Sequence, residues 1–569
     1  MPPALAFLDR RLATREALAR HGWSRIALVA TIHGAAAVVM WLTEETLLDK
    51  AAFVLAWGFL NFLLLAALRR PVLAGAFALA LITVLVLLSR LKHSILFMTV
   101  NFVDLMIIDT DTFGFLMTVV PGLAEKVATG LAVAALALAA VWWLDSFRVR
   151  LRSATFGCAV SLAGLTGLSL SVDSDPYNEF TAGQYVSKFA RSGIVAVGEY
   201  LDRGLLEADA QVNGTLGGVA DASCTTAHRP PNIVMVFDES SFDLTAMPGV
   251  RAPAGYREHF ASLDGKARRL VVEGVGGPSW YTEYNVLTGL SVRSYGRFAD
   301  FVTRIAAGRV ERGLPHALRR CGYRTFSLYS FMGAFLSARR FHETTGIEHF
   351  YDSAALGAKG VEPDSFYYDA AARIFGRERG RQPLFLMVYT LANHFPWDYR
   401  FRPELTPGWR DPGNGSEADE YLRRQMLSKR HYGEFVARLA REFPHEPFLI
   451  VRFGDHQPAF ARTLIDPKYD ESFVMRQMAA HDPRFLTTYY AIDAINFTPR
   501  DLGLAHETLD APYLPLVVLE AAGLPLDPSF AEQKRILQGC RGLFYRCRGG
   551  AEARRFNRLL IDAGLIKGL

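Results

Sequence analysis

Long apolar runs dominate roughly the first third of the chain. Each is close to the roughly 20 residues with which a helix crosses a bilayer. We therefore expect five membrane spans, at about residues 26–43, 51–68, 71–89, 127–144 and 154–172. Charged and polar residues interrupt the apolar stretch between the third and fourth runs. They are Lys92, His93, Asn101, Asp104, Asp109 and Asp111. Since a charge in mid-bilayer is costly, residues 90–126 are predicted to form an interfacial or re-entrant helix, with a surface-lying linker as the simpler alternative.

The charges flanking these runs predict the orientation of the spans. A basic tail precedes the first run, and no small-residue cleavage site ends that run, so the tail is not typical of a cleavable signal. Acidic residues (Glu44, Glu45, Asp49) follow the first run, whereas arginines follow the second (Arg69, Arg70) and the fourth (Arg148, Arg150, Arg152). By the positive-inside rule the tail is cytoplasmic, and everything after about residue 173 lies outside the cytoplasm.

The pattern changes after Pro230 and Pro231. Residues 173–229 form a mixed connector with an amphipathic stretch near 186–205. Beyond it, short β-rich runs alternate with helical patterns, at 232–237, 322–329, 384–390 and 447–453. Such alternation is typical of an α/β domain with a mainly parallel sheet. The predicted organisation is a transmembrane domain over 1–172, a connector, and an exported α/β domain over 230–569.

Polar clusters follow three of these runs. They are Asp238 to Ser241, Asn393-His394 and Gly454-Asp455-His456. Ligand sites of open α/β sheets lie at the carboxyl ends of the strands, so the clusters could meet in one crevice. Glu239, Asp455 and His456 would supply two carboxylate oxygens and an imidazole nitrogen, a set that favours one Mn²⁺ ion, with Zn²⁺ or Mg²⁺ as alternatives. Taken singly, a strand-end Asp is more often a helix cap.

A candidate nucleophile lies in the stretch 270–290. The sequence of this stretch predicts a strand, a Gly-Gly-Pro turn and a helix that begins near Ser279. The positive end of the helix dipole and a bound metal would both activate the Ser279 hydroxyl. The simpler alternative is that Ser279 only caps the helix.

The five cysteines contain no Cys-x-x-Cys pair, so we expect no zinc ribbon. Cys158 falls within the fifth apolar run, which leaves an even number outside the cytoplasm, where disulfides form. Four cysteines allow three pairings. Proximity favours Cys540 with Cys547, and hence Cys224 with Cys321.

Composition supports a hybrid of membrane and water-facing parts, with 50% hydrophobic and 21% charged residues. The net charge of +5 is spread without a basic block interleaved with aromatics, so nucleic acid is not an expected partner. The spans lack the paired intramembrane charges and the inverted repeat expected of a transporter.

These motifs resemble the sulfatase and alkaline-phosphatase-like superfamily, and within it the membrane-anchored phosphoglycerol transferases, such as lipoteichoic acid synthase and the glucan phosphoglycerol transferases. The resemblance covers about residues 230–525. It rests on the strand ending in Glu239, the pair Glu283-Tyr284 four residues after Ser279, and the Asn-His-Phe-Pro and Gly-Asp-His motifs at 393–396 and 454–456.

The resemblance implies roles for individual residues. Ser279 would be the nucleophile and would share the metal with Glu239, Asp455 and His456. The family usually has Thr at the nucleophile position, and Thr282 is the rival if the register differs. Substrate contacts would come from Arg339 (or the adjacent Arg340), Asn393, His394 and Trp397, with Arg339 and His394 also serving catalysis.

The implied function is metal-dependent transfer of phosphoglycerol from phosphatidylglycerol to an envelope glycan, such as a periplasmic glucan, through a phospho-Ser279 intermediate. The protein would lie in the bacterial inner membrane with its catalytic domain in the periplasm. Alternatives are a phosphoethanolamine transferase, a membrane-bound phosphatase or phosphodiesterase, and a non-catalytic scaffold. A true sulfatase would need a Cys/Ser-x-Pro-x-Arg motif, but Trp-Tyr-Thr-Glu follows Ser279. The acceptor and the oligomeric state stay open.

Overall fold

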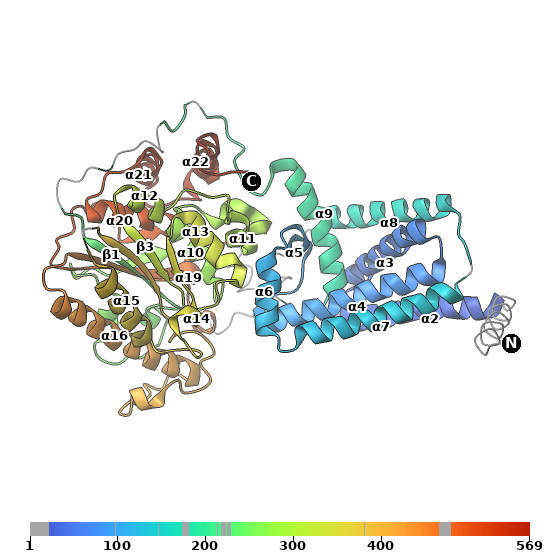
Figure 1. Ribbon diagram of the computed structural model, residues 1–569, viewed down its shortest axis with the longest axis horizontal. Coiled ribbons are helices and arrows are strands. Elements are labelled where there is room, and N and C mark those ends of the chain that lie inside the picture. Colours follow the sequence, from blue (N-terminus) through green and yellow to red (C-terminus); the bar gives the residue numbers. More distant parts are fainter. Residues whose placement is uncertain are drawn as a thin grey trace, which may run out of the picture. The chain divides into compact units, whose positions relative to one another are not determined.

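In the computed structural model the chain forms two compact units (Figure 1). Unit 1 comprises residues 1–109 and 116–202, and unit 2 comprises 110–115 and 203–569. The boundary thus falls inside the predicted connector. The residues that the structure describes are 22–96, 98–145, 147–172, 181–212, 214–217, 224, 229–380, 382–465 and 480–569. Most of the predicted cytoplasmic tail lies outside them.

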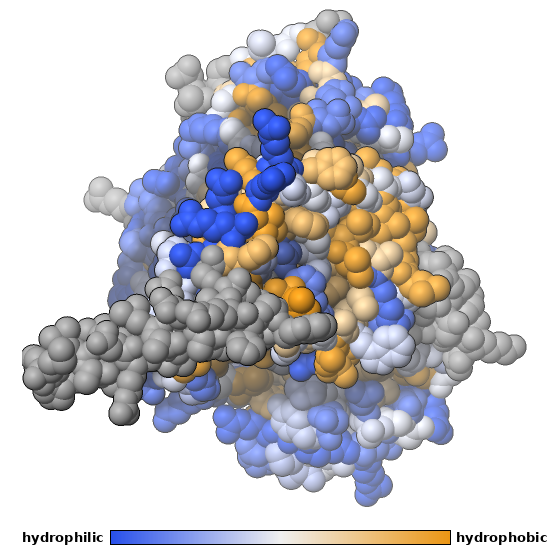
Figure 2. All heavy atoms as spheres, turned by 90° about the vertical axis from the view of Figure 1, so that its right-hand side faces the viewer, coloured by the Kyte–Doolittle hydropathy of each residue, from blue (hydrophilic) through white to orange (hydrophobic). Residues whose placement is uncertain are grey.

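Among the described residues of unit 1, five helices are long and apolar enough to cross a membrane. They are α2 (Gly22–Thr43), α3 (Leu47–Leu68), α4 (Pro71–Leu96), α7 (Leu123–Leu144) and α8 (Leu151–Ser171). Large apolar side chains on them are exposed, among them Trp41, Leu136 and Phe156. Figure 2 shows broad hydrophobic areas on the face that it presents. Apolar helices with exposed apolar surface indicate an integral membrane protein, as the sequence pattern predicted.

The segment predicted as one interfacial helix is built differently. α4 continues to Leu96, and two short helices follow, α5 (Phe102–Met106) and α6 (Thr110–Val119). The polar residues explain this arrangement. Lys92 pairs with Asp104 at 2.7 Å, and the Asn101 side chain caps α5 by accepting from the backbone N–H of Asp104. The location of residues 90–126 at the membrane interface stays a prediction. The amphipathic connector helix is α9 (Tyr185–Arg203).

Unit 2 is built on a mainly parallel eight-stranded sheet in the order β4-β3-β5-β1-β6-β7-β2-β8. Only β7 runs antiparallel to its neighbours, β6 and β2. The four runs picked out in the sequence are β1, β3, β5 and β6. The strands are β1 (Asn232–Asp238), β2 (Arg268–Val271), β3 (Arg324–Leu328), β4 (His349–Tyr351), β5 (Leu384–Tyr389), β6 (Phe448–Gly454), β7 (Thr487–Ile495) and β8 (Thr508–Asp510).

Helices cover both faces of the sheet (Figure 1). One face packs on α15 (Asp364–Glu378) and α16 (Ser416–Glu442), and alternate residues of the central strands, such as Val234, Val236 and Ile450, enter that core. Unit 2 has further helices: α10 (Ser279–Thr288), α11 (Val302–Ala306), α12 (Leu314–Arg320), α13 (Ala338–Thr345), α14 (Ser353–Leu356), α17 (Ala461–Ile465), α19 (Pro483–Leu486), α20 (Leu514–Ala522), α21 (Pro528–Cys540) and α22 (Ala551–Asp562). Because β1, β5 and β6 are buried along their whole length, their runs are almost continuously apolar.

Two disulfides link Cys224 to Cys321 and Cys540 to Cys547. This is the pairing that proximity favoured among the three possible ones. The fifth cysteine, Cys158, is free and lies in α8.

Candidate active site

The sheet brings two of the predicted carboxylates together. β1 and β6 are neighbouring parallel strands with Asp238 opposite Gly454, so the next residue of each strand, Glu239 or Asp455, leaves the sheet at the same edge. The approach is close, because a Cβ on Gly454 would lie 1.9 Å from the Ser241 carbonyl oxygen. The backbone N–H of Ser240 then donates to Asp455 Oδ1 at 2.7 Å and fixes that carboxylate.

Glu239, Asp455 and His456 form a buried ligand set, with one donor atom from each lying within 4.8 Å of the others. His456 Nε2 lies 3.2 Å from Asp455 Oδ2 and 3.6 Å from Glu239 Oε1. The other ring nitrogen, Nδ1, lies 2.9 Å from the Gln457 carbonyl oxygen. That bond requires a proton on Nδ1, which leaves the Nε2 lone pair directed at the carboxylates, as metal ligation requires.

Electrostatics indicate that this set is suited to a cation. Burial, together with the charge of Asp455, raises the pKa of Glu239 well above its ordinary value. Asp455 Oδ2 is buried and has no hydrogen-bond donor among the described residues. Two adjacent buried carboxylates with an orphaned oxygen are expected where a positive charge completes the site. The O, O, N donor set fits a divalent transition metal, as predicted.

Ser279 lies beside the ligand set at the first residue of α10. Its Oγ is 3.3 Å from Glu239 Oε2 and 3.2 Å from His456 Nε2. The rival, Thr282, is fully buried one turn later, and its hydroxyl donates to the Asp455 backbone carbonyl at 2.7 Å. The geometry therefore favours Ser279 as the nucleophile and gives Thr282 a supporting contact.

The loop after β5 carries the Asn-His-Phe-Pro motif, but its side chains diverge. Burial lowers the pKa of His394, and the charges of Asp455 and His456 are close enough to affect that pKa as well. The amide of Asn393 is buried and donates to Ser428 Oγ at 3.2 Å. Trp397 is also buried, and its indole N–H donates to the Asn393 carbonyl. The predicted substrate contacts of Asn393 and Trp397 are thus not brought to the ligand set, because both side chains anchor the loop from within.

The predicted substrate arginine has partners of its own. Arg339 Nη2 donates to Asp352 Oδ2 at 3.0 Å, and Nη1 donates to the Phe350 carbonyl at 3.1 Å. Its neighbour Arg340 pairs with Asp111 at 3.6 Å. No contact of Arg339 with the ligand set appears in the described part of the chain, so its substrate role stays a prediction.

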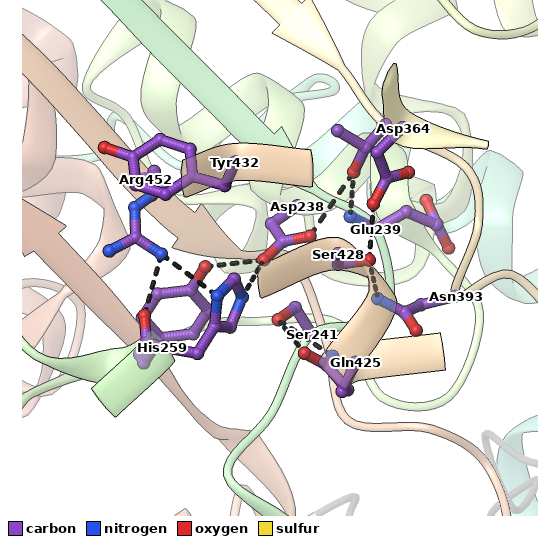
Figure 3. A network of polar contacts seen from close by, with 12 residues as sticks. Asp238, Glu239, Ser241, His259, Asp364, Asn393, Gln425, Ser428, Tyr432 and Arg452 are labelled. Atoms are coloured by element: carbon purple, nitrogen blue, oxygen red, sulfur yellow. Dashed lines mark hydrogen bonds and ion pairs between the residues drawn. The ribbon is translucent and has the colours of Figure 1, made fainter. Parts of the chain in front are cut away.

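A polar network behind the ligand set was not foreseen (Figure 3). Asp238 accepts from Tyr489 Oη at 2.6 Å and lies 3.0 Å from His259 Nε2, and Arg452 donates to the His259 carbonyl at 2.7 Å. Strand alternation sends Asp238 and Glu239 to opposite faces of the sheet, so Asp238 faces this network rather than Ser279. The sequence carries no spacing signal for His259.

A second buried pair, Glu283 and His342, was also missed. His342 Nε2 lies 3.1 Å from Glu283 Oε1, and Tyr389 Oη lies 3.3 Å from the same nitrogen. The position of Glu283 one turn after Ser279 on α10 was the only available signal, since His342 is distant in sequence. The pair fixes α10, and with it Ser279, against α13.

Comparisons with known proteins give one family match, one distant relative in sequence and several solved structures of low similarity. The family model for sulfatases matches residues 275–486, which lie within unit 2. An uncharacterized protein of Haemophilus influenzae is 23% identical over 252 residues, which are 40% of this chain and 45% of that protein. The match therefore spans less than half the length of that relative.

Solved structures with related folds are distant. The phosphoglycerol transferase GacH of Streptococcus pyogenes, in complex with sn-glycerol-1-phosphate, is 14% identical with a TM-score of 0.46, over 59% of this chain and 85% of that one. The lipooligosaccharide phosphoethanolamine transferase EptA of Neisseria meningitidis, an integral membrane protein, is 12% identical with a TM-score of 0.41, over 83% and 95%. Similarity at this level says nothing about the substrate of this chain.

Proposed function

We propose that this protein is a membrane-bound phosphoglycerol transferase that moves the phosphoglycerol headgroup of phosphatidylglycerol to an envelope glycan through Ser279. The observation that carries the proposal is a serine hydroxyl 3.2–3.3 Å from two members of a buried Glu–Asp–His ligand set. A periplasmic location of unit 2, on the outer side of the bacterial inner membrane, is part of the proposal. The residues after Ser279 support phosphoryl transfer over sulfate hydrolysis, because they lack the Pro and Arg that a sulfatase nucleophile needs.

In the first step the Ser279 Oγ bonds to the lipid phosphorus as the bond from phosphorus to the diacylglycerol oxygen breaks. The Ser279 proton passes to Glu239 Oε2, 3.3 Å away, and protonated His394 delivers a proton to the departing oxygen. A divalent cation held by Glu239, Asp455 and His456, with Mn²⁺ favoured, would withdraw electron density from the phosphate and lower the pKa of the neighbouring hydroxyl.

In the second step an acceptor hydroxyl takes the phosphoglycerol group. Its oxygen bonds to phosphorus, its proton passes to neutral His394, and the bond from phosphorus to Ser279 Oγ breaks as Ser279 recovers its proton from Glu239. His394 suits the role of base in this second step, because burial lowers its pKa and its Nδ1 lies 2.8 Å from the Phe395 carbonyl oxygen, which leaves Nε2 to take the proton. Tethering to the membrane raises the effective concentration of a lipid donor.

The test is to incubate the purified full-length protein, in detergent with Mn²⁺, with isotopically labelled phosphatidylglycerol or phosphatidylethanolamine. Trypsin would release residues 270–293, and fragment-ion mass spectrometry would locate any adduct on Ser279 or Thr282. We expect a phosphoglycerol adduct on Ser279. An ethanolamine phosphate adduct would instead make the protein a phosphoethanolamine transferase.

Matched variants separate chemistry from folding. Ser279→Ala should abolish the adduct, whereas Ser416→Ala, at an exposed position of α16, should not change it. Absence of an adduct with both lipids, under conditions that trap slow turnover, contradicts the proposal and favours a scaffold. Rapid release of glycerol phosphate to water without any glycan acceptor would contradict the transferase and indicate a phosphodiesterase.

A further inference from the structure

A cavity of about 310 Å³ lies in unit 2 beside strands β2 and β8, apart from the candidate active site. We name it the arginine pocket, because four arginines line it: Arg269, Arg293, Arg541 and Arg546. None of the four residues of the nucleophile and ligand set lines it. Its volume is at the lower end of the roughly 300–1,000 Å³ of small-molecule sites.

A disulfide-closed loop forms one wall of the arginine pocket. The bond between Cys540 and Cys547 closes the loop, and Arg541, Gly542, Leu543 and Arg546 from within it line the cavity. Gly542 has a φ of 92°, and a Cβ there would lie 2.9 Å from the Thr508 carbonyl oxygen. The Asp510 backbone N–H donates to the Gly542 carbonyl at 3.0 Å. The loop is therefore fixed against β8, which holds its arginines in place without a ligand.

Three of the four guanidinium groups of the arginine pocket have no ion pair in the described part of the chain, whereas Arg269 pairs with Glu507 at 3.2 Å. Arg541 is exposed and has no hydrogen bond or ion pair in the described part of the chain. Arg293 lies over the Tyr545 ring at 4.4 Å, and its Nε is buried without a hydrogen-bond partner among the described residues. Arg546 donates to two backbone carbonyls, which carry no charge. Unpaired guanidinium donors around a cavity are the arrangement that binds oxyanions.

Two acidic residues, Glu273 and Asp510, line the cavity, and neither forms an ion pair with its arginines in the described part of the chain. Glu273 uses its oxygens to accept from Asn285, Ser291 and the backbone of Val292, and burial raises its pKa. Burial also raises the pKa of Asp510 to about 7, although Arg293 and Arg546 oppose the shift. Four arginines thus share the lining of the cavity with two carboxyls.

We propose that the arginine pocket is a binding site for an anionic saccharide, in which the arginines hold a phosphate or carboxylate group. Thr487 and Thr508 also line the cavity. The Thr487 hydroxyl donates to the Pro483 carbonyl and Thr508 Oγ1 accepts from Arg269, so the first can still accept, and the second can still donate, a hydrogen bond with a sugar hydroxyl. The site does not depend on the proposed transferase activity. It concerns a cavity whose residues have no part in the chemistry at Ser279.

The test uses full-length protein in detergent, with Asp455→Ala and EDTA present so that the ligand set cannot hold an anion. Isothermal titration would measure binding of glucose 6-phosphate, glucuronate and glucose. We expect glucose 6-phosphate or glucuronate to bind and neutral glucose not to bind. The stronger of the two anionic probes identifies the recognised group.

Variants assign the binding to the cavity. Arg541→Gln removes an exposed side chain and should weaken the anionic probe at least about tenfold, because charge-assisted bonds are the strong ones. Arg546→Gln should act in the same direction. Arg558→Gln, an exposed arginine on α22 that pairs with Asp562, should leave the affinity unchanged. Equal binding of glucose, unchanged affinity in both pocket variants, or no binding of any probe at about 10 mM, well above a Kd of about 1 mM, would overturn the proposal.

Discussion

Arg424 positions the loop that carries His394, so replacing Arg424 should lower both the stability of the protein and its activity. Arg424 is fully buried on α16. Its Nη1 donates to the His394 carbonyl at 2.9 Å and its Nη2 donates to the Pro396 carbonyl at 2.9 Å, with longer bonds to two more carbonyls of the loop. Its Nε donates to Glu420 Oε1 at 2.7 Å. One guanidinium therefore ties the whole turn after β5 to the helix.

The magnitude follows from these contacts. Arg424→Met leaves the loop carbonyls unsatisfied, whereas Glu420 keeps its bonds to Arg423 and to the backbone N–H of Phe401. Since each buried acceptor without a donor costs about 1–3 kcal/mol, we expect a total cost of about 3–5 kcal/mol. Arg424→Lys keeps the charge, but one ammonium cannot span the same carbonyls, so we expect a smaller cost of about 1–3 kcal/mol. Arg441→Met, at an exposed position of the same helix, should cost less than about 0.5 kcal/mol.

Urea titration of the full-length protein, read by pulse proteolysis, measures the stability changes. The functional effect is measured by kcat in a double-mutant cycle with His394→Ala. If Arg424 acts by positioning His394, Arg424→Lys should lower kcat in the wild type, yet change it little when His394 is absent. A loss of general acid–base catalysis is expected to cost about 10²–10⁴-fold. Additive losses of kcat, or a stability cost no larger than that of Arg441→Met, would refute this reasoning.

Further predictions concern the nucleophile, the disulfides, the ligand set and the core. Ser279→Thr should retain transfer whereas Ser279→Ala should lose it by roughly a thousandfold or more, measured with labelled lipid. The two disulfides close loops of 97 and 7 residues. The entropy of closing these loops predicts that Cys321→Ser lowers the free energy of unfolding by about 4.7 kcal/mol and Cys540→Ser by about 2.4 kcal/mol. Equal shifts of the urea midpoint in the two variants would contradict this loop-closure model. Removing the metal with a chelator should lower the thermal midpoint of the wild type but not of Asp455→Ala. If the metal was present at 100 times its Kd, the wild type should lose about 2.7 kcal/mol of its free energy of unfolding. Burial raises the pKa of Asp364 to about 6, so its contribution to stability is present below about pH 4 and is lost as the pH rises through 6; relative to Asp364→Asn, the wild type should lose about 3 kcal/mol between pH 4 and 8 in urea titrations.

Strand-end residues were predictable because their signals are local. A run of apolar residues marks a buried strand, and the polar residue that ends the run marks the edge of the sheet. This was enough to select Glu239, Asp455 and His456, and the Gly-Pro turn before a helical pattern was enough to select Ser279. The adjacency of β1 and β6, which lie more than 200 residues apart, had to be assumed.

The network behind the site could not be predicted, because its contacts are long-range and follow no period. His259 lies in a short 3-10 helix and reaches Asp238 only when that helix packs on the sheet. Local motifs also cannot show which way a loop side chain turns. Trp397 follows the Asn-His-Phe-Pro motif and was assigned to substrate, yet it packs against Tyr421 and Phe460 in the core.

The most direct measurement of the central claim is anomalous diffraction from crystals of the full-length protein grown with Mn²⁺. We predict a peak bonded to carboxylate oxygens of Glu239 and Asp455 and to His456 Nε2, at about 2.0–2.3 Å, with Ser279 Oγ facing it. A peak elsewhere, or none at saturating Mn²⁺ with these three side chains ordered, would contradict the assignment of a metal-dependent serine nucleophile.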